Sequence, residues 1–443
     1  IKKYLKNFNQ NIVFKNTKID FNHTSVGDET LKLDGKAKFT DDFEKIKIER
    51  SYIKSTKKNK INIFSTLKNS YINIPNINYK KIDGVDAEVS FYLEIIKDKL
   101  FLINNFNFIS KKNKILLKGI KLNKKFEIND LKEVKIKTYL NKSINNDFKI
   151  KKSDKVLIDG EFYDSQYILN SLYKKNNKKT FSKKFSSPIV VNFKNALTGT
   201  GDNLSNFSMI ASIDKGTYKK LSLKGNFSKN EILEMSIYHD KNNKKTLQVF
   251  SDRARPFMNN FDFIKGFEGG KLEYESSTTN NKSISNLIIT DFKVSKVPAL
   301  AKLLTLASLR GIADTLSGEG IHFDSFEMKS NTEGNVLNIE DALAMGPAVS
   351  ILLDGYVDKG KTVSLRGTLV PATMLNSIIA TIPLVGNILV GKKTGDGVVG
   401  VSFKMKGPPK KIKTTVNPIK TLTPRFIVRA VEKITKKKKE NSK

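Results

Sequence analysis

The 443-residue chain contains no cysteine and only three histidines. Without cysteine the chain has no disulfide framework, no thiolate metal ligand and no thiol nucleophile. His23, His239 and His322 lie far apart in the sequence and form no HExxH-type pair. We therefore expect each histidine to be a hydrogen-bonded or exposed side chain rather than a metal ligand. The lack of cysteine suits an oxidising compartment, where a stray thiol is a liability.

Sequence motifs of the common catalytic sites are also missing. Residues 391–400, GKKTGDGVVG, lack the GxxxxGK[ST] order of a P-loop. The GTGD sequence at 199–202 lacks the third glycine and the following helix of a dinucleotide-binding loop, so we interpret it as a turn. Glu340 and Asp341 are expected at a surface turn rather than as an acid/base pair, and no GxSxG elbow is present. The sequence predicts a protein that is not an enzyme and has no cofactor or metal.

Negative charge is scarce, because 79 lysines and arginines stand against 44 aspartates and glutamates, which gives a net charge of +35. The excess is +24 over residues 1–290, +5 over 291–420 and +6 over 421–443, so no single patch holds it. Lysine and asparagine occur together, as in YKKNNKKT at 173–180, and this composition indicates solvated strand faces and turns. No recognised nucleic-acid-binding motif accompanies the charge. An anionic partner, such as a membrane surface, remains the alternative interpretation.

Period-two alternation of apolar and polar residues dominates the chain. It is found in FSMIASID (207–214), VVGVSFKMKG (398–407), NKINIF, AEVSFYLEII, KILLKGIKL, EVKIKTYL, KKLSLKGNF, ILEMSIYH and TVSLRGTLV. Gly, Asn, Asp and Lys clusters separate these runs, as expected for a long antiparallel meander with one apolar face. A dozen or more such strands are too many for one compact β-sandwich. The sequence predicts a mainly β fold with few helices, built as an elongated, twisted and open antiparallel β-groove.

Helical patterns are few and lie late in the chain. The run from Pro298 to Gly318 places leucines at helical spacing, which predicts a helix over about 297–316. Residues 368–391 carry no charge, but Pro383 and Gly386 break them, so they predict two short helices over about 371–390 rather than a full membrane span. This broken hairpin either plugs the end of the groove or dips into a membrane. Residues 425–443 form a basic amphipathic tail with Lys436–Lys439 at its end.

From about residue 247 onward the chain resembles the C-terminal region of the AsmA-like envelope proteins, most closely their YhdP branch. The motifs that carry the resemblance occur in matching order, from Asp291-Phe292-x-Val294 and the Pro298–Gly311 helix to Gly318-x-Gly320-Ile321-x-Phe323, Gly346-Pro347, Gly367–Pro371, Asn376, Ile382–Gly386, Gly407-Pro408 and Val416-Asn417-Pro418. Upstream, VLIDGEFYDSQYILNSL at 156–172 resembles a step that recurs in such proteins, with Asp164 and Ser165 in place. Arg425 departs from the pattern, where glycine is expected.

The resemblance implies a lipid-transfer protein that carries phospholipid along the apolar groove between the inner and outer membranes of a bacterial envelope. It also implies a periplasmic location with an inner-membrane anchor helix that this chain lacks. We divide the chain into an N-terminal part of the groove (1–175), central repeats (176–290), an AsmA-like C-terminal region (291–424) and the tail (425–443). The predicted membrane-contact or plug residues are Met374, Leu375, Ile378, Ile379, Ile382, Leu384, Val385, Ile388 and Leu389.

The alternating strands supply the candidate lining of the groove. Its residues are Met209, Ala211, Ile213, Leu221, Leu223, Leu247, Val249, Ile288, Phe292, Val363, Leu365, Val399, Val401 and Phe403. Which face of each strand points inward stays open, because a one-residue shift of register inverts it. Two other functions remain as alternatives: a non-transporting structural or assembly factor of the envelope with a closed core, and a binder of an anionic polymer.

Overall fold

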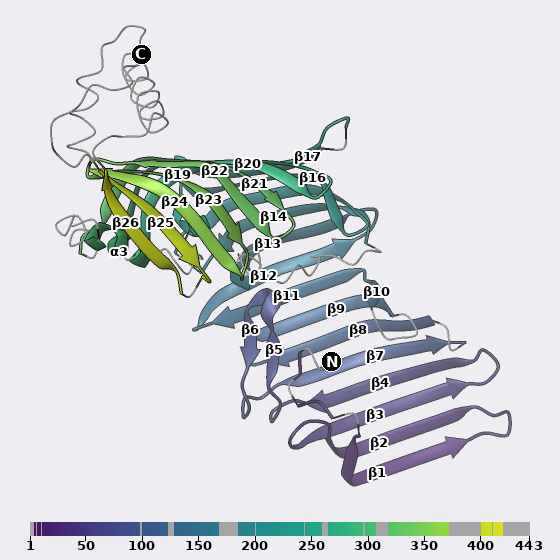
Figure 1. The fold of residues 1–443 in the computed structure, drawn as a ribbon. Coiled ribbons are helices and arrows are strands. Elements are labelled where there is room, and N and C mark those ends of the chain that lie inside the picture. The colour runs from purple at the N-terminus through teal and green to yellow at the C-terminus, as the bar shows by residue number, and fades with distance from the viewer. Residues whose placement is uncertain are drawn as a thin grey trace. The chain divides into compact units, whose positions relative to one another are not determined.

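The fold is mainly β, as predicted, and its sheet is open and largely antiparallel (Figure 1). In the computed structural model, the described residues are 4–5, 7–9, 11–97, 100–122, 128–167, 185–199, 201–242, 244–258, 265–295, 297–306, 318–371, 400–409 and 411–419. They form two compact units, the first comprising residues 1–219 and 223–228 and the second comprising 220–222 and 229–443. The boundary falls inside the segment that we assigned to central repeats.

Unit 1 consists of strands, one hairpin and one short 3-10 helix. Its main strands are β1 (Val13–His23), β2 (Glu29–Lys38), β3 (Phe43–Ile53), β4 (Lys58–Thr66), β7 (Glu88–Ile96), β8 (Leu100–Ser110), β9 (Asn113–Leu122), β10 (Ile128–Asp130), β11 (Glu133–Leu140), β12 (Ser143–Lys152), β13 (Val156–Asp164), β14 (Ser187–Leu197) and β15 (Leu204–Asp214). Between β4 and β7 the chain forms the hairpin of β5 (Ile72–Ile74), η1 (Pro75–Ile77) and β6 (Tyr79–Lys81). Strand β16 (Thr217–Ser228) is divided between the two units.

Unit 2 combines ten strands with the two α-helices of the described residues. The strands are β17 (Glu231–His239), β18 (Lys245–Ser251), β19 (Lys265–Thr279), β20 (Lys282–Ser295), β21 (Ile321–Glu333), β22 (Val336–Met345), β23 (Val349–Asp358), β24 (Thr362–Pro371), β25 (Gly400–Gly407) and β26 (Lys413–Ile419). The helices are α2 (Arg255–Met258) and α3 (Pro298–Leu306). From β17 to β26 each strand pairs antiparallel with the next along the chain.

The meander of unit 1 is antiparallel with one exception. Strands β13 and β14 are parallel neighbours, with Ile158 opposite Val191 and Gly160 opposite Phe193. A parallel pair needs a long crossover connection, whereas an antiparallel pair needs only a turn. The remaining neighbours in this unit for which the register is defined are antiparallel. The sequence pattern predicts the strands on both sides of the parallel pair, but not their relative direction.

Polar residues interrupt the alternation where the backbone of a strand is irregular. The apolar side chains before and after the interruption then lie on the same face of the sheet. In β8, Phe101 and Ile103 differ in parity from Phe106 and Phe108, and the pairing with β7 shifts between them at the two asparagines Asn104 and Asn105. In β20, Asp291 adopts a positive φ of 55°, which places Phe292 on the same face as Ile289. A bulge adds one residue to one strand, so it resets the phase of the alternation.

The core of unit 2 lies between one face of its sheet and the two helices. Leu303 and Leu304 of α3 are 4% and 0% exposed, and they pack in one cluster with Ile289, Phe292 and residues of β24 and β25. The Phe292 ring lies between two others and stacks on Phe267 with a centroid distance of 5.2 Å and on Phe323 with a centroid distance of 5.5 Å. Helix α3 is therefore held by its apolar side against the sheet.

Several sequence expectations are resolved or corrected here. The helix predicted over 297–316 is present as α3, and residues 307–317 lie outside the described part. The surface turn expected at Glu340 and Asp341 is wrong, because both residues lie inside β22, where a bulge adjusts the pairing with β23. The helices predicted over 371–390, Val399 and the 425–443 tail lie outside the described residues, apart from Pro371, which ends β24. No described helix is both long and apolar enough to cross a bilayer.

Replacing Leu304 with alanine should lower the free energy of unfolding of unit 2 by about 2–5 kcal/mol, because the substitution opens a cavity in a closed cluster. The matched control is Leu306→Ala on the same helix, whose side chain is 45% exposed and should cost far less. Urea unfolding followed by circular dichroism measures both. Equal losses for the two variants would contradict the packing of α3 described above.

Candidate functional site

One face of unit 1 carries an unbroken row of apolar side chains that crosses twelve strands. Each residue of this central row lies directly opposite the next on the neighbouring strand. Its members are Ile19, Leu33, Ile48, Ile63, Phe91, Phe106, Leu117, Val134, Ile150, Ile158, Val191 and Met209. With neighbouring strands about 4.8 Å apart, eleven spacings give a row of about 50 Å.

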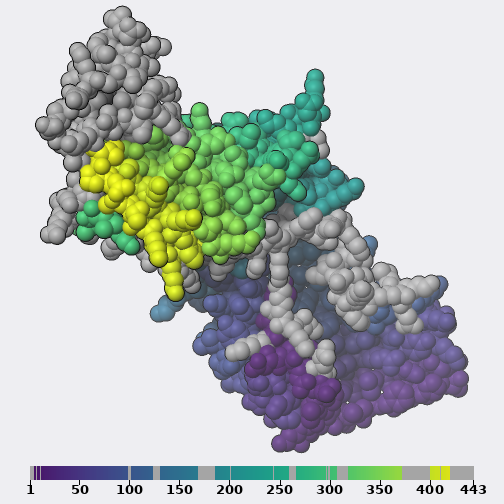
Figure 2. Space-filling model, in the orientation of Figure 1, coloured from purple at the N-terminus to yellow at the C-terminus, as the bar shows by residue number. Residues whose placement is uncertain are grey.

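The central row is partly accessible. Ile48, Ile63, Phe91, Phe106 and Leu117 are all of intermediate exposure, whereas a closed sandwich core would bury them. The strands that carry most of the row are coloured purple and blue in the space-filling view (Figure 2). At the β1 edge, Ile19 is 60% exposed. This face is a stripe of apolar surface that has no full cover among the described residues.

A second row, the covered row, runs beside the central row and is more deeply buried. It consists of Gly35, Ile46, Ser65, Val89, Phe108, Ile115, Ile136, Phe148, Gly160, Phe193 and Phe207. Phe148 and Phe193 meet edge to face at 5.7 Å, and the Phe193 ring also stacks on Tyr163 at 5.1 Å. Both phenylalanines are at most 8% exposed. Burial also raises the pKa of the Tyr163 phenol.

The hairpin β5–η1–β6 covers part of this second row and forms a wall beside the central row (Figure 1). Tyr79 of the hairpin meets Phe108 edge to face at 5.9 Å. The Asn146 amide donates to the Ile77 carbonyl at 2.7 Å, and the Asn78 amide donates to the Asp164 carboxylate at 2.9 Å. These polar side chains are hydrogen-bonded where they are buried, so they fix the hairpin without an unsatisfied group.

A buried charge pair anchors the base of the hairpin. Lys81 is 2% exposed and donates to the backbone carbonyls of Lys68, Ser70 and Ile82 at 2.8–3.1 Å. Glu44, also 2% exposed, accepts hydrogen bonds from the Thr66 hydroxyl and from the backbone N–H of Asn69. Burial lowers the pKa of Lys81, and attraction to Glu44 opposes this effect.

The opposite face of unit 1 is polar and charged. Asp20, Lys32 and Glu49 lie opposite one another across β1, β2 and β3, and Lys18, Asp34 and Lys47 form the neighbouring row. Lys47 and Asp34 form an ion pair at 2.9 Å, which lowers the pKa of the aspartate. The sheet thus has one face for apolar contact and one for water. Polar residues also occur at one end of the apolar face.

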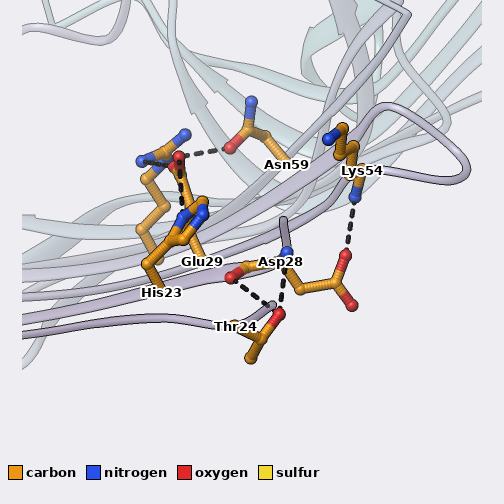
Figure 3. Close-up of polar contacts among 7 residues, drawn as sticks. His23, Thr24, Asp28, Glu29, Lys54 and Asn59 are labelled. Atoms are coloured by element: carbon orange, nitrogen blue, oxygen red, sulfur yellow. Dashed lines mark hydrogen bonds and ion pairs between the residues drawn. The ribbon is translucent and has the colours of Figure 1, made fainter. Parts of the chain in front are cut away.

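This polar end is a cluster on β1, β2, β3 and β4 (Figure 3). The Arg50 guanidinium forms an ion pair with Glu29 at 3.1 Å and donates to Asn59 at 2.8 Å, and His23 lies 3.8 Å from Glu29. The neighbouring turn is held by Asp28, whose backbone N–H donates to the Thr24 hydroxyl. Arg50 interrupts the apolar row next to the central row but not the central row itself.

The corresponding apolar face of unit 2 is filled. Its rows continue from Val249, Tyr274 and Leu287 to Gly367, Phe403 and Val416, but α2 and α3 pack on them. Val401 and Phe403 are 5% and 3% exposed within this cluster. The two units therefore share one sheet design and differ in what covers it.

The predicted lining residues divide between these two faces. Met209, Ala211 and Ile213 lie on the apolar face of unit 1, where Met209 is opposite Val191 and Ala211 is opposite Ile189. A larger group lies on the filled face of unit 2, namely Leu247, Val249, Phe292, Val363, Leu365, Val401 and Phe403. Leu221 is buried and Leu223 is partly buried in β16. Val399 and the nine predicted hairpin residues from Met374 to Leu389 lie outside the described part.

Ile288 alone is placed on the other face. It lies opposite Glu273 and Glu327, while its neighbour Ile289 is 1% exposed inside the cluster with Phe292. Period-two counting joins Ile288 to Phe292, but the left-handed backbone at Asp291 changes the parity between them without shifting the pairing register. Most of the central row was absent from the predicted lining, although the alternating runs NKINIF, AEVSFYLEII and EVKIKTYL contain three of its members, Ile63, Phe91 and Val134.

No protein-family model, curated protein or solved structure matches the chain. The function therefore has to be argued from the faces described above. Within the described residues, no group of three His, Asp or Glu side chains is placed to hold a metal ion. A cavity of about 680 Å³ lies on the polar face of unit 1, and its lining also includes Ile136, Phe148 and Phe193 of the covered row.

The pKa of Lys81 gives a testable pH dependence. Below its lowered pKa, Lys81 is charged in both the folded and the unfolded chain, and burial of the charge weakens the folded state. Between that pKa and 10.5 the unfolded chain holds the proton more tightly, so this residue's contribution to the free energy of unfolding rises with pH. In urea titrations the free energy of unfolding of the wild-type protein minus that of Lys81→Met should rise as the pH increases through the lowered pKa of Lys81 toward 10.5.

The exposed neighbour Lys80 supplies the control, because Lys80→Met should leave the pH dependence of the wild type unchanged. A difference for Lys81→Met that stays level or shrinks over this range would contradict a lowered pKa for the buried ammonium.

Proposed function

We propose that this chain is part of a bridge-like lipid-transfer protein, in which acyl chains of phospholipids lie on the apolar face of unit 1. The unbroken, partly exposed central row is the observation that carries this proposal. A contiguous apolar surface of this length is unusual on a soluble domain and is characteristic of a binding surface. The resemblance of the sequence to AsmA-like envelope proteins supports the same function, and with it we propose a location between the inner and outer membranes.

The energetics of such a surface suit movement along it. Each buried methylene contributes about 0.8 kcal/mol, so ten methylenes moved out of water onto the row gain about 8 kcal/mol. Every position of the central row is apolar, so an acyl chain meets no charged step between β1 and β15. Lipid headgroups remain in water, and no covalent chemistry is required. The charged opposite face keeps the sheet hydrated.

A structural or assembly role in the envelope is the second candidate, and unit 2 favours it. Its apolar face is closed by α2 and α3, with Leu304 and Leu369 both at 0% exposure. A chain that was closed in this way throughout would bind no lipid. The two candidates are separated by whether phospholipid occupies the face of unit 1.

A charge on the central row should remove bound lipid without unfolding the protein. Ile63→Glu places a carboxylate between Ile48 and Phe91, and we expect phospholipid in organic extracts of the purified protein to fall by at least about tenfold, because an acyl chain would have to desolvate the charge. Asn62→Glu is the matched control, since it adds the same charge one residue away on the opposite, polar face of β4. Mass spectrometry of the extracts and transfer of fluorescent phospholipid between vesicles measure the effect.

Equal lipid content and equal transfer for the two variants, with folding retained by circular dichroism, would reject the proposal. A wild-type protein that carries no phospholipid and transfers none would favour the structural role. Charges at Val401 or Phe403 make a poorer test, because both side chains are enclosed in the cluster of unit 2 and a charge there would report on folding.

A further inference from the structure

The cavity on the polar face of unit 1 is lined by an unusual arrangement of lysines. Its volume is about 680 Å³, within the range of small-molecule sites, and five lysines but only three carboxylates line it. Four of the lysines, Lys114, Lys135, Lys137 and Lys149, come from the adjacent strands β9, β11 and β12. Asp147 is the one carboxylate that these three strands contribute. This end of the cavity therefore carries a formal charge of +3.

The strand register sets these lysines against one another. Lys114 lies directly opposite Lys137, and Lys135 lies directly opposite Lys149. Like charges on directly opposed strand positions are destabilising, whereas a Glu–Lys pair such as Glu133 with Lys118 next to the cavity is favourable. A bound anion would reduce the repulsion within these two lysine pairs.

The carboxylates of the cavity neutralise only part of this charge. Lys137 pairs with Asp147 at 2.7 Å, and Lys149 pairs with Asp159 at 3.6 Å. Lys135 reaches only Glu133, at 3.8 Å and with half of its side chain exposed. No described carboxylate lies within ion-pair distance of Lys114. In one opposed pair Lys135 has only a weak ion pair, and in the other Lys114 has no described ion-pair partner. These two ammonium groups are available to bind a ligand.

We propose that this cavity binds a phosphate monoester group. With five lysines and three carboxylates the whole cavity carries a formal charge of +2, which a doubly charged phosphate matches better than a single carboxylate does, and lysine binds phosphate as a mobile point charge. The cavity exceeds the size of inorganic phosphate, so it takes a phosphate carried on a larger group, such as a sugar phosphate. Because it lies on the face opposite the central row, this site is independent of the lipid-transfer proposal.

The test uses the full chain and two double variants of equal charge. Lys135→Gln with Lys149→Gln removes one opposed pair inside the cavity. Lys36→Gln with Lys45→Gln removes an opposed lysine pair on β2 and β3, outside the cavity. Calorimetry at low salt measures binding of glucose 6-phosphate, with glucose as the uncharged probe, and flotation measures binding to phosphatidylcholine vesicles with and without phosphatidic acid.

We expect glucose 6-phosphate to bind the wild-type protein, glucose not to bind, and the cavity variant to weaken binding at least tenfold while the control variant changes it less than twofold. Loss of vesicle binding in the cavity variant alone, without binding of the soluble ester, would support the site with a lipid as the source of the phosphate. The proposal is overturned if neither probe binds, if glucose binds equally well, or if both double variants weaken binding to the same extent. Circular dichroism confirms that each variant is folded.

Discussion

The in-register pairing of successive strands is the constraint on which the rest of the structure depends. Because side chains alternate between the two faces of a strand, a shift of one residue would move every apolar side chain of that strand to the polar face. The central row remains continuous only because Ile48 meets Ile63, Ile63 meets Phe91, and so on across the sheet. The charged rows of the opposite face depend on the same register. One set of pairings thus creates both the apolar stripe and the lysine-lined cavity.

The apolar face of the sheet is covered differently in the two units. In unit 2, α2 and α3 supply the missing layer, and the cluster around Ile289 and Leu304 is closed. In unit 1 the hairpin at Ile72–Lys81 covers part of the covered row, and the central row stays partly accessible. Buried polar groups hold this hairpin, since Lys81, Glu44 and Asn146 each find hydrogen-bond partners. The accessible row is therefore bordered by a fixed wall.

Much of the fold follows from alternation in the sequence, and the exceptions have local causes. Strands such as β4, β7, β11 and β24 are predicted where they occur, because each alternates without interruption. Ile288 is misplaced because the left-handed residue Asp291 resets the phase of β20, and a short polar residue gives little warning of such a backbone irregularity. The parallel pairing of β13 with β14 and the opposition of Lys135 to Lys149 depend on which strands become neighbours. That information is absent from the local pattern, so neither was predictable.

The order of strand pairing also bears on how the chain folds. From β17 to β26 every strand pairs with its immediate successor, and most connections are short, although 25 residues separate β20 from β21 and 28 separate β24 from β25. Such a sheet can grow by one strand at a time from any completed hairpin, in the manner of a repeat protein with nearest-neighbour coupling. The junction of β13 and β14 is different because the pair is parallel, and the 22 residues between Asp164 and Ser187 have to return the chain to the start of its neighbour before that pair can form. In unit 1 this connection and the 21 residues between Thr66 and Glu88 are the longest that must close, so they carry the largest entropy cost of loop closure.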